Sequence, residues 1–281
     1  MHKRIDSHQH FWKYDPSVHG WINNSMHKIK KDFLPEDLAP LLLDNQFLGC
    51  VAVQADQVEE ETKFLLGLAK EYDFIKGVVG WVNLLDENVS ERLNYFSPEK
   101  KLKGFRHVVQ GEADGFMLRK DFRHGIAALK EYGYTYDILV FHHQLPDAIN
   151  LVNHFPDQPF VLDHIAKPDF KTGNIKKWKE DIKELAKAEN VLCKVSGMVT
   201  EAHWHSWSPD DLKPCLDVVF ENFTADRLMF GSDWPVCNVA ASYREVVNIV
   251  QDYVAQLSQD EQDMVWFKNA QAFYSLEVLN V

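Results

Sequence analysis

The chain has 281 residues, 46% of them hydrophobic and 26% charged, which is typical of a globular protein and excludes a fibrous or disordered one. Its net charge of −12 repels a phosphate backbone and argues against nucleic-acid binding. The cysteines contain no CxxC pair, so Cys50, Cys193, Cys215 and Cys237 indicate free thiols in a reducing compartment rather than a disulfide framework or a zinc knuckle.

Nothing in the sequence indicates export or membrane insertion. No apolar run approaches the ~20 residues of a membrane span. The first predicted strand begins at about Arg4, which leaves no room for a signal peptide. We therefore expect a cytoplasmic protein that acts on a small molecule, with neither nucleic acid nor membrane as a partner. The sequence leaves open whether the chain forms a homo-oligomer.

Short β-rich runs alternate with longer amphipathic segments along the whole chain. The predicted strands are Arg4 to His10, Gly49 to Ala55, Gly77 to Leu84, Gly104 to Val109, Thr135 to Phe141, Phe160 to Ile165, Val191 to Ser196 and Leu228 to Asp233. A helix is predicted after each strand; in Glu59 to Lys70, for example, Phe64, Leu65 and Leu68 mark one face.

This alternation predicts a parallel sheet with right-handed crossovers. Eight strand–helix units close a (β/α)8 TIM barrel, which needs about 250 residues. No linker or repeat interrupts residues 1–281, so we predict a single domain. A doubly wound open sheet is the alternative architecture.

Two long connections are candidates for the mouth of the barrel. The segment Lys13 to Leu34 follows Trp12 and contains Trp21. The segment Thr200 to Pro214 contains Trp204 and Trp207. We expect both to lie over the end of the barrel at which the strands finish.

The first strand carries a pair of histidines in Asp-Ser-His-Gln-His. Residues two apart in a strand point to the same face, so His8 and His10 should project together into the barrel. Paired imidazoles suit metal ligation or direct contact with a substrate. Taken alone, the pattern is more often that of two interior histidines without a function.

Two further strands end in polar residues. The sixth reads Val-Leu-Asp-His-Ile-Ala-Lys-Pro and presents His164 and Lys167, although Asp163 capping a turn with His164 as its partner is the alternative. The eighth reads Leu-Met-Phe-Gly-Ser-Asp-Trp-Pro, which indicates a buried strand opening into a site. Asp233 there suits proton abstraction from water or metal binding; a helix N-cap is the alternative.

These motifs together resemble those of the amidohydrolase-2 family of TIM-barrel hydrolases, and most closely its sugar-lactone hydrolases. The segments that carry the resemblance are DSHQHFW, LDHIAKP and FGSDWPV, with GVVGWV, KGFRH, CKVSG and the terminal NAxxFY as further matches. The resemblance spans nearly the whole chain. It implies hydrolysis of a lactone such as L-fuconolactone or L-rhamnonolactone, but no motif identifies the sugar.

Carried over to this chain, the family pattern assigns roles to individual residues. His8, His10 and His164 would form the catalytic cluster, and Asp233 would activate water. Arg106, at the end of the fourth strand, resembles a substrate-anchoring arginine, with an interior ion pair as the alternative. The neighbouring His107 would point away from the site. The other substrate-binding candidates are His142, Lys167 and Trp204.

The fourth strand departs from the pattern of two-metal relatives, because Arg106 stands where a bridging lysine would be expected. The resemblance therefore implies at most one divalent metal ion, such as Zn2+, held by His8, His10 and Asp233. His164 or His142 would be a fourth ligand. A metal-free site in which the histidines contact the substrate carbonyl is the alternative.

Two other functions remain open at the level of sequence. A metal-dependent non-oxidative decarboxylase shares the fold and the paired histidines. A catalytically inactive barrel that binds a sugar is the alternative from outside the enzymes.

Overall fold

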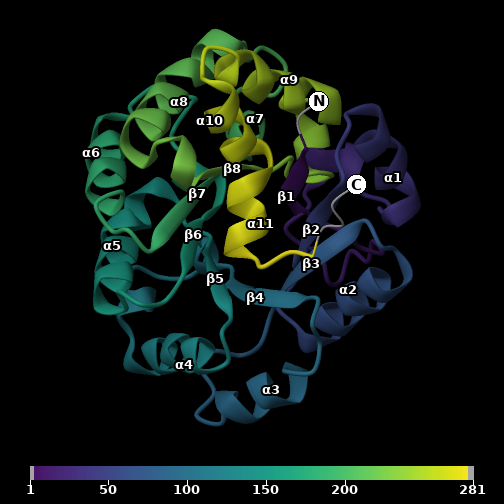
Figure 1. The fold of residues 1–281 in the computed structure, drawn as a ribbon, viewed down its shortest axis with the longest axis vertical. Helices are drawn as coiled ribbons and strands as arrows, with labels where there is room; N and C mark the ends of the chain where they lie inside the picture. The colour runs from purple at the N-terminus through teal and green to yellow at the C-terminus, as the bar shows by residue number, and fades with distance from the viewer. Residues whose placement is uncertain (1–2, 278–281) are drawn as a thin grey trace.

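The computed structural model describes residues 3–277 and contains one eight-stranded parallel sheet in the order β1 to β8. The strands are β1 Ile5–Gln9, β2 Gly49–Val53, β3 Ile75–Gly80, β4 Leu102–His107, β5 Thr135–Ile138, β6 Phe160–Leu162, β7 Val191–Val195 and β8 Leu228–Phe230. All eight predicted strands are present, and the predicted TIM barrel is confirmed (Figure 1).

The barrel closes between β1 and the chain that follows β8. The amide of Asp233 donates to the carbonyl of His8 at 2.8 Å, and the amide of His10 donates to the carbonyl of Trp234 at 2.7 Å. Because these bonds join the first strand to the last, the alternative of an open, doubly wound sheet is wrong. The closing contacts also fix the positions of the proposed catalytic residues on both strands.

Helices surround the barrel. They are α1 Pro35–Asp44, α2 Glu59–Glu71, α3 Val89–Phe96, α4 Lys120–Glu131, α5 Leu145–His154, α6 Lys176–Leu185, α7 Met198–Glu201, α8 Pro209–Phe223, α9 Tyr243–Val254, α10 Gln259–Asp263 and α11 Asn269–Phe273. In α2 the predicted face is rotated: Thr62, Leu65, Leu66 and Ala69 are buried, whereas Phe64 and Leu68 are only half-buried. The buried spacing of i, i+3, i+4 and i+7 is that of a helix packed on a sheet. No helix within residues 3–277 is long and apolar enough to cross a membrane.

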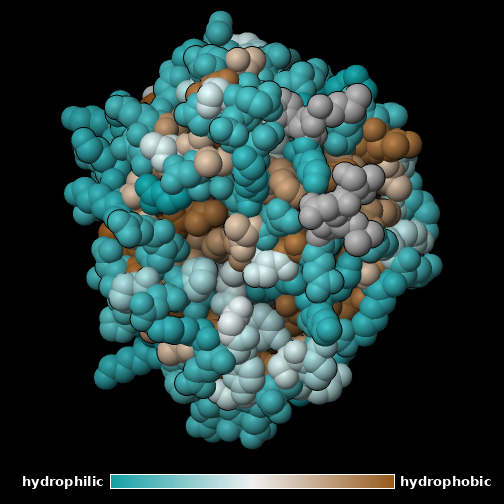
Figure 2. Space-filling model, viewed as in Figure 1, coloured by the Kyte–Doolittle hydropathy of each residue, from teal (hydrophilic) through white to brown (hydrophobic). Residues whose placement is uncertain are grey.

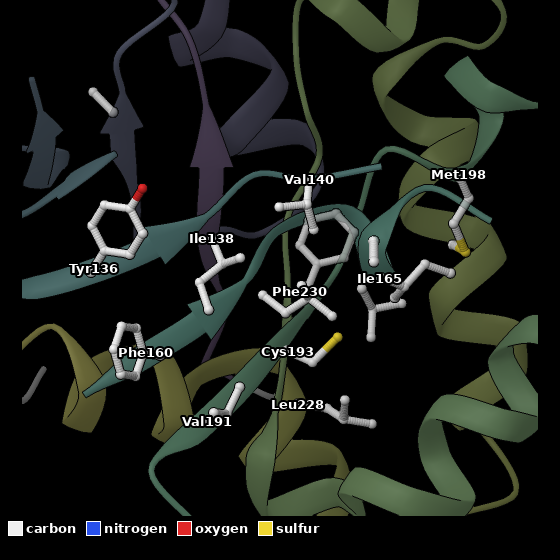
Figure 3. Close-up of a cluster of buried hydrophobic side chains, with 14 of the residues drawn as sticks. Tyr136, Ile138, Val140, Phe160, Ile165, Val191, Cys193, Met198, Leu228 and Phe230 are labelled. Atoms are coloured by element: carbon white, nitrogen blue, oxygen red, sulfur yellow. The ribbon is translucent and has the colours of Figure 1, made fainter. Parts of the chain in front are cut away.

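The apolar side chains form two layers. Outward-facing residues of the strands, among them Tyr136, Phe160 and Cys193, pack against the surrounding helices (Figure 3). A smaller inner cluster joins residues of the strands to Tyr274 and Leu276. Helix α11 lies across the end of the barrel that faces the viewer in Figure 1, and the surface on that side is mostly hydrophilic (Figure 2). The opposite end is left for the site.

The strands end earlier than predicted, and three of them illustrate how the pattern changes near the C-terminal end. The pairing register of β1 with β2 shifts between Asp6 and Gln9. Strict alternation would point Asp6 to the same face as His8, but its carboxylate instead accepts a hydrogen bond from the hydroxyl of Tyr243 in α9. Strands β6 and β8 end at Leu162 and Phe230, earlier than predicted. The residues that follow each strand are free of the backbone hydrogen bonding of the sheet at this end of the barrel. Barrels place their active sites at this end.

Two helical glycines test how tightly the helices pack on the barrel. A Cβ at Gly125 in α4 would lie 2.2 Å from the carbonyl oxygen of Leu84, whereas nothing lies within 4 Å of one at Gly67 in α2. We expect Gly125→Ala to lower the free energy of unfolding by about 1–3 kcal/mol through overpacking. The control Gly67→Ala should raise it by about 0.5–1 kcal/mol through helix propensity. Urea unfolding measures both, and a stabilised Gly125→Ala variant would contradict the packing described.

Candidate active site

A cavity of about 530 Å³ opens at the C-terminal end of the barrel. Its deepest polar lining consists of His10, Arg106, His164 and Asp233. Both long connections reach it, as predicted: the first supplies Trp21, Asn23 and Met26, and the second supplies Thr200, Glu201 and Trp204. The size is in the range of small-molecule sites.

The structure brings the four predicted catalytic residues together. Nε2 of His8 lies 3.2 Å from Nε2 of His10. Oδ1 of Asp233 lies 3.4 Å from Nε2 of His10, 4.0 Å from Nε2 of His8 and 3.9 Å from Nε2 of His164. Nδ1 of His10 donates to the carbonyl of Val53 at 2.7 Å, so a neutral His10 turns the lone pair of Nε2 toward this cluster.

An unusual backbone segment places His164 and Lys167 in the cavity. His164, Ile165, Ala166 and Lys167 all have positive φ, between 47° and 58°. Such a run is costly for residues other than glycine, above all for a β-branched one. The indole of Trp178 donates to the carbonyl of Ile165 at 2.8 Å, and the buried Ile165 packs in the outer core. The surrounding structure therefore holds the segment in a conformation that turns both polar side chains inward.

Arg106 combines the two roles considered from the sequence. Its guanidinium lines the cavity, but Nη1 also donates to Oδ2 of Asp163 at 3.0 Å and lies 3.2 Å from Nε2 of His8. Nη2 donates to the carbonyl and the side-chain oxygen of Gln54. These contacts leave the group oriented and only 3% exposed. An arginine held in this way is a fixed positive charge at the floor of the cavity.

A buried lysine that was not predicted from the sequence lies beneath the histidines. Lys194 of β7 is fully buried, and its Nζ lies 2.5 Å from Oδ2 of Asp137 and 3.0 Å from Oδ1 of Asp163. It also lies 3.1 Å from Nδ1 of His8. Tyr274 donates to Asp137 from below. The CKVSG match contained Lys194, and a lysine in an otherwise apolar strand was the signal that could have identified it.

The electrostatics of the cluster favour a carboxylate beside neutral imidazoles. Burial would raise the pKa of Asp233, but the imidazoles of His164, His10 and His8 around the carboxylate together hold it below its usual value. Burial lowers the pKa of His164 to about 4, although the negative charge of Asp233 acts to raise it. Burial also holds the pKa of His8 well below its usual value. At neutral pH the site therefore presents an ionised Asp233 to neutral His8 and His164.

Two groups of residues have ligand atoms close enough to hold a metal ion, and both include His8. The first is His8, His10 and Asp233. The second uses Asp163, whose oxygens are already engaged by the cations of Arg106 and Lys194. A neutral imidazole has a single ring-nitrogen lone pair, so His8 can be a ligand in only one of the two groups at a time. The donors fit one divalent ion.

Other predicted residues lie away from the cavity. His142, proposed as a substrate or metal contact, is not among the lining residues, and its Nδ1 lies 3.0 Å from the carbonyl of Lys167. His143 is exposed and lies 3.8 Å from Asp114. Strand β5 ends at Ile138 instead of Phe141; of the residues that follow, Leu139 and Phe141 line the cavity and these histidines do not. His107 points away, as predicted, and pairs with Glu112.

Gly197 provides a test of how His164 is held. A Cβ at this position would lie 2.6 Å from Nδ1 of His164, and the residue has a φ of +64°. We expect Gly197→Ala to shift the imidazole resonances of His164 and to destabilise the fold by more than its backbone strain of about 1–2 kcal/mol. Gly173→Ala is the matched control, because Gly173 has a φ of +69° but nothing within 4 Å. Equal destabilisation of the two variants, with unchanged His164 resonances, would show that Gly197 does not confine the ring.

Comparison with known proteins gives a consistent family assignment. The profile of a family described as amidohydrolase matches residues 5–276. The chain is 41% identical to an L-fucono-1,5-lactonase of Burkholderia multivorans over 97% of this chain and 96% of that one. A second L-fucono-1,5-lactonase, from Burkholderia ambifaria, is 34% identical over 92% of this chain and 87% of that one. A crystal structure of an amidohydrolase from Burkholderia multivorans with bound zinc superimposes with a TM-score of 0.95 at 40% identity, covering 98% of this chain and 100% of that one.

Proposed function

Because the chain belongs to the amidohydrolase family, we propose that it is a lactone hydrolase that opens a sugar lactone to the aldonic acid. L-Fucono-1,5-lactone is the first candidate substrate, and L-rhamnonolactone is the second. The observation that carries the proposal is the convergence of the Asp233 carboxylate with His10, His164 and Arg106 at the floor of one cavity. The four free, buried cysteines support a reducing compartment, and we propose the cytoplasm.

Asp233 is the proposed base. Its carboxylate accepts a proton from water while the water oxygen bonds to the lactone carbonyl carbon, and the carbonyl π electrons move onto oxygen. When the resulting tetrahedral alkoxide collapses, the bond to the ring oxygen breaks, and Asp233 returns its proton to that oxygen. The product is an open-chain hydroxy acid, which ionises at neutral pH and releases one proton to solvent.

The fixed positive charges of the cavity are proposed to stabilise the alkoxide. The guanidinium of Arg106 is oriented by Asp163 and Gln54, so it need not reorganise as charge develops. The ammonium of Lys167 lies 3.0 Å from Glu201 near the rim and is positioned to bind hydroxyl groups of the sugar. Trp204, also in the lining, provides an apolar face for the ring, while its indole nitrogen donates to the carbonyl of Thr200.

One divalent metal ion is compatible with these residues. His8, His10 and Asp233 offer two nitrogens and one oxygen with mutual distances of 3.2–4.0 Å, and this donor set suits zinc. When bound, a metal would act as a Lewis acid toward the lactone carbonyl. We propose that at most one ion binds per chain, because Arg106 places a permanent charge next to His8.

A panel of aldonolactones tests the proposed reaction. We expect acid release from L-fucono-1,5-lactone, and more slowly from related 6-deoxy or six-carbon lactones, because every ring opening produces an ionised acid. A pH indicator measures the rate after subtraction of spontaneous opening. Decarboxylation of an aromatic acid without acid release from any lactone would overturn the proposal. Sugar binding without turnover would overturn it in favour of an inactive barrel.

Replacement of the proposed base tests the mechanism. Asp233→Asn keeps the size of the side chain but removes its ability to accept a proton from water, so kcat should fall by at least ~10²-fold. KM for the lactone should change little. Asp210→Asn, at an exposed position of α8, is the control and should retain wild-type turnover. A folded Asp233→Asn enzyme with near-wild-type kcat would remove Asp233 from this role.

A further inference from the structure

Lys194 is a charged group next to the site for which the proposed reaction has no use. It lies beneath His8 and does not line the cavity. Its contacts with Asp137 and Asp163 leave its charge balanced, since two carboxylates face the two cations Lys194 and Arg106. This buried pairing explains why the charges are tolerated. It does not explain the third contact, with the imidazole of His8.

The number of hydrogens on Lys194 determines what that contact must be. A buried ammonium has three hydrogens, and each needs an acceptor. Around Nζ the described residues place hydrogen-bond partners in Asp137 at 2.5 Å and Nδ1 of His8 at 3.1 Å, and an ion pair with Oδ1 of Asp163 at 3.0 Å. The third hydrogen is satisfied only if Nδ1 of His8 carries a lone pair. A neutral His8 then has its own hydrogen on Nε2.

The hydrogen bonding of His10 is compatible with a hydrogen on Nε2 of His8. His10 donates from Nδ1 to the carbonyl of Val53, so its Nε2 is an acceptor, 3.2 Å from Nε2 of His8. Lys194, His8 and His10 therefore form one directed chain of hydrogen bonds. The competing arrangement would place the hydrogen of His8 on Nδ1, toward Oδ1 of Asp163 at 3.3 Å. Nε2 would then accept from Arg106.

The competing arrangement provides fewer hydrogen-bond acceptors for the buried cation Lys194 than the first arrangement does. Arg106 keeps its bonds to Asp163 and Gln54 in either arrangement, and its side chain borders the cavity, where solvent or substrate can accept the second hydrogen of Nη1. Lys194 is fully enclosed and would keep one hydrogen without a partner. An unmet hydrogen on a buried cation costs more than one at the edge of a cavity.

We infer that Lys194 is a positioning residue that fixes the hydrogen of His8 on Nε2 and thereby competes with a divalent metal for this histidine. A metal bound by His8, His10 and Asp233 needs the lone pair of His8 Nε2. That lone pair becomes available only when the hydrogen moves to Nδ1 and the bond from Lys194 is lost. Lys194 thus weakens metal binding in a site whose other donors are suitable. This inference rests on the metal site of the proposed function.

The tautomer is measured in the unaltered protein. Long-range proton–nitrogen NMR of ¹⁵N-histidine protein, stripped of metal with EDTA, distinguishes the protonated from the unprotonated ring nitrogen of His8. A His8→Gln variant assigns the signals. We expect the hydrogen on Nε2. A hydrogen on Nδ1 overturns the inference, whatever the lactone assay shows, because this measurement requires neither turnover nor bound metal.

Zinc affinity provides the second measurement. Lys194→Met alone leaves buried carboxylates without their partner and can fail to fold, so the decisive variant is Lys194→Met with Asp137→Asn, which removes opposite charges together. The double variant keeps the net charge of the protein, so a gain in affinity does not arise from a change in net charge, and the tautomer of His8 identifies its cause. We expect zinc to bind the double variant at least about tenfold more tightly, in competition with a chromophoric chelator. The hydrogen of metal-free His8 should then move to Nδ1.

A matched pair of substitutions controls for the general effect of removing a buried lysine. Lys76 of β3 is also largely buried, at 8% exposure, and lies 2.8 Å from Asp73. Lys76→Met with Asp73→Asn should leave zinc affinity and the His8 tautomer unchanged. Equal zinc affinities of the wild type and the Lys194 double variant would overturn the inference. Absence of zinc binding in every variant would reject the proposed metal site, and the tautomer of the wild type would still decide the role of Lys194.

Discussion

The interior of the barrel depends on the pairing of buried charges. Lys194 and Arg106 come from β7 and β4, and Asp137 and Asp163 come from β5 and the end of β6. Each charge would be costly to bury alone, whereas the removal of one partner leaves another charge unpaired. The four side chains therefore fix one another, and they fix the orientation of the histidine that lies above them.

This charged layer separates two regions with different tasks. Below it, the inner apolar cluster and α11 close the end of the barrel at which the strands begin. Above it, the backbone departs from regular geometry where polar side chains must face the cavity. The register shift in β1 turns Asp6 toward α9, and the left-handed segment after β6 turns His164 and Lys167 inward. The rigid strands thus hold the site in place, and the irregular backbone at their ends sets the exact positions of its side chains.

The electrostatic consequences extend to the proposed chemistry. A carboxylate base must be ionised to accept a proton from water. Burial keeps the neighbouring imidazoles of His8 and His164 neutral, so they do not form ion pairs with it. The fixed guanidinium of Arg106 stands at the same floor. Its charge favours an alkoxide and opposes a second cation. The proposed limit of one metal ion therefore rests on the same residue that is proposed to stabilise the transition state.

The sequence by itself determined the eight strands, the barrel and the end of the barrel at which His8, His10, His164 and Asp233 lie, because strand periodicity and the edge at which parallel strands end are local properties. Only the tertiary structure decided the rest. Lys194 lies in a strand buried on both faces, where alternation does not reveal which side chain points inward, and its partner Asp137 is 57 residues away. The sequence also did not show that β5 ends at Ile138, after which Leu139 and Phe141 line the cavity and His142 does not. Pairing between distant strands and the exact end of a strand are set by packing, which no local pattern contains.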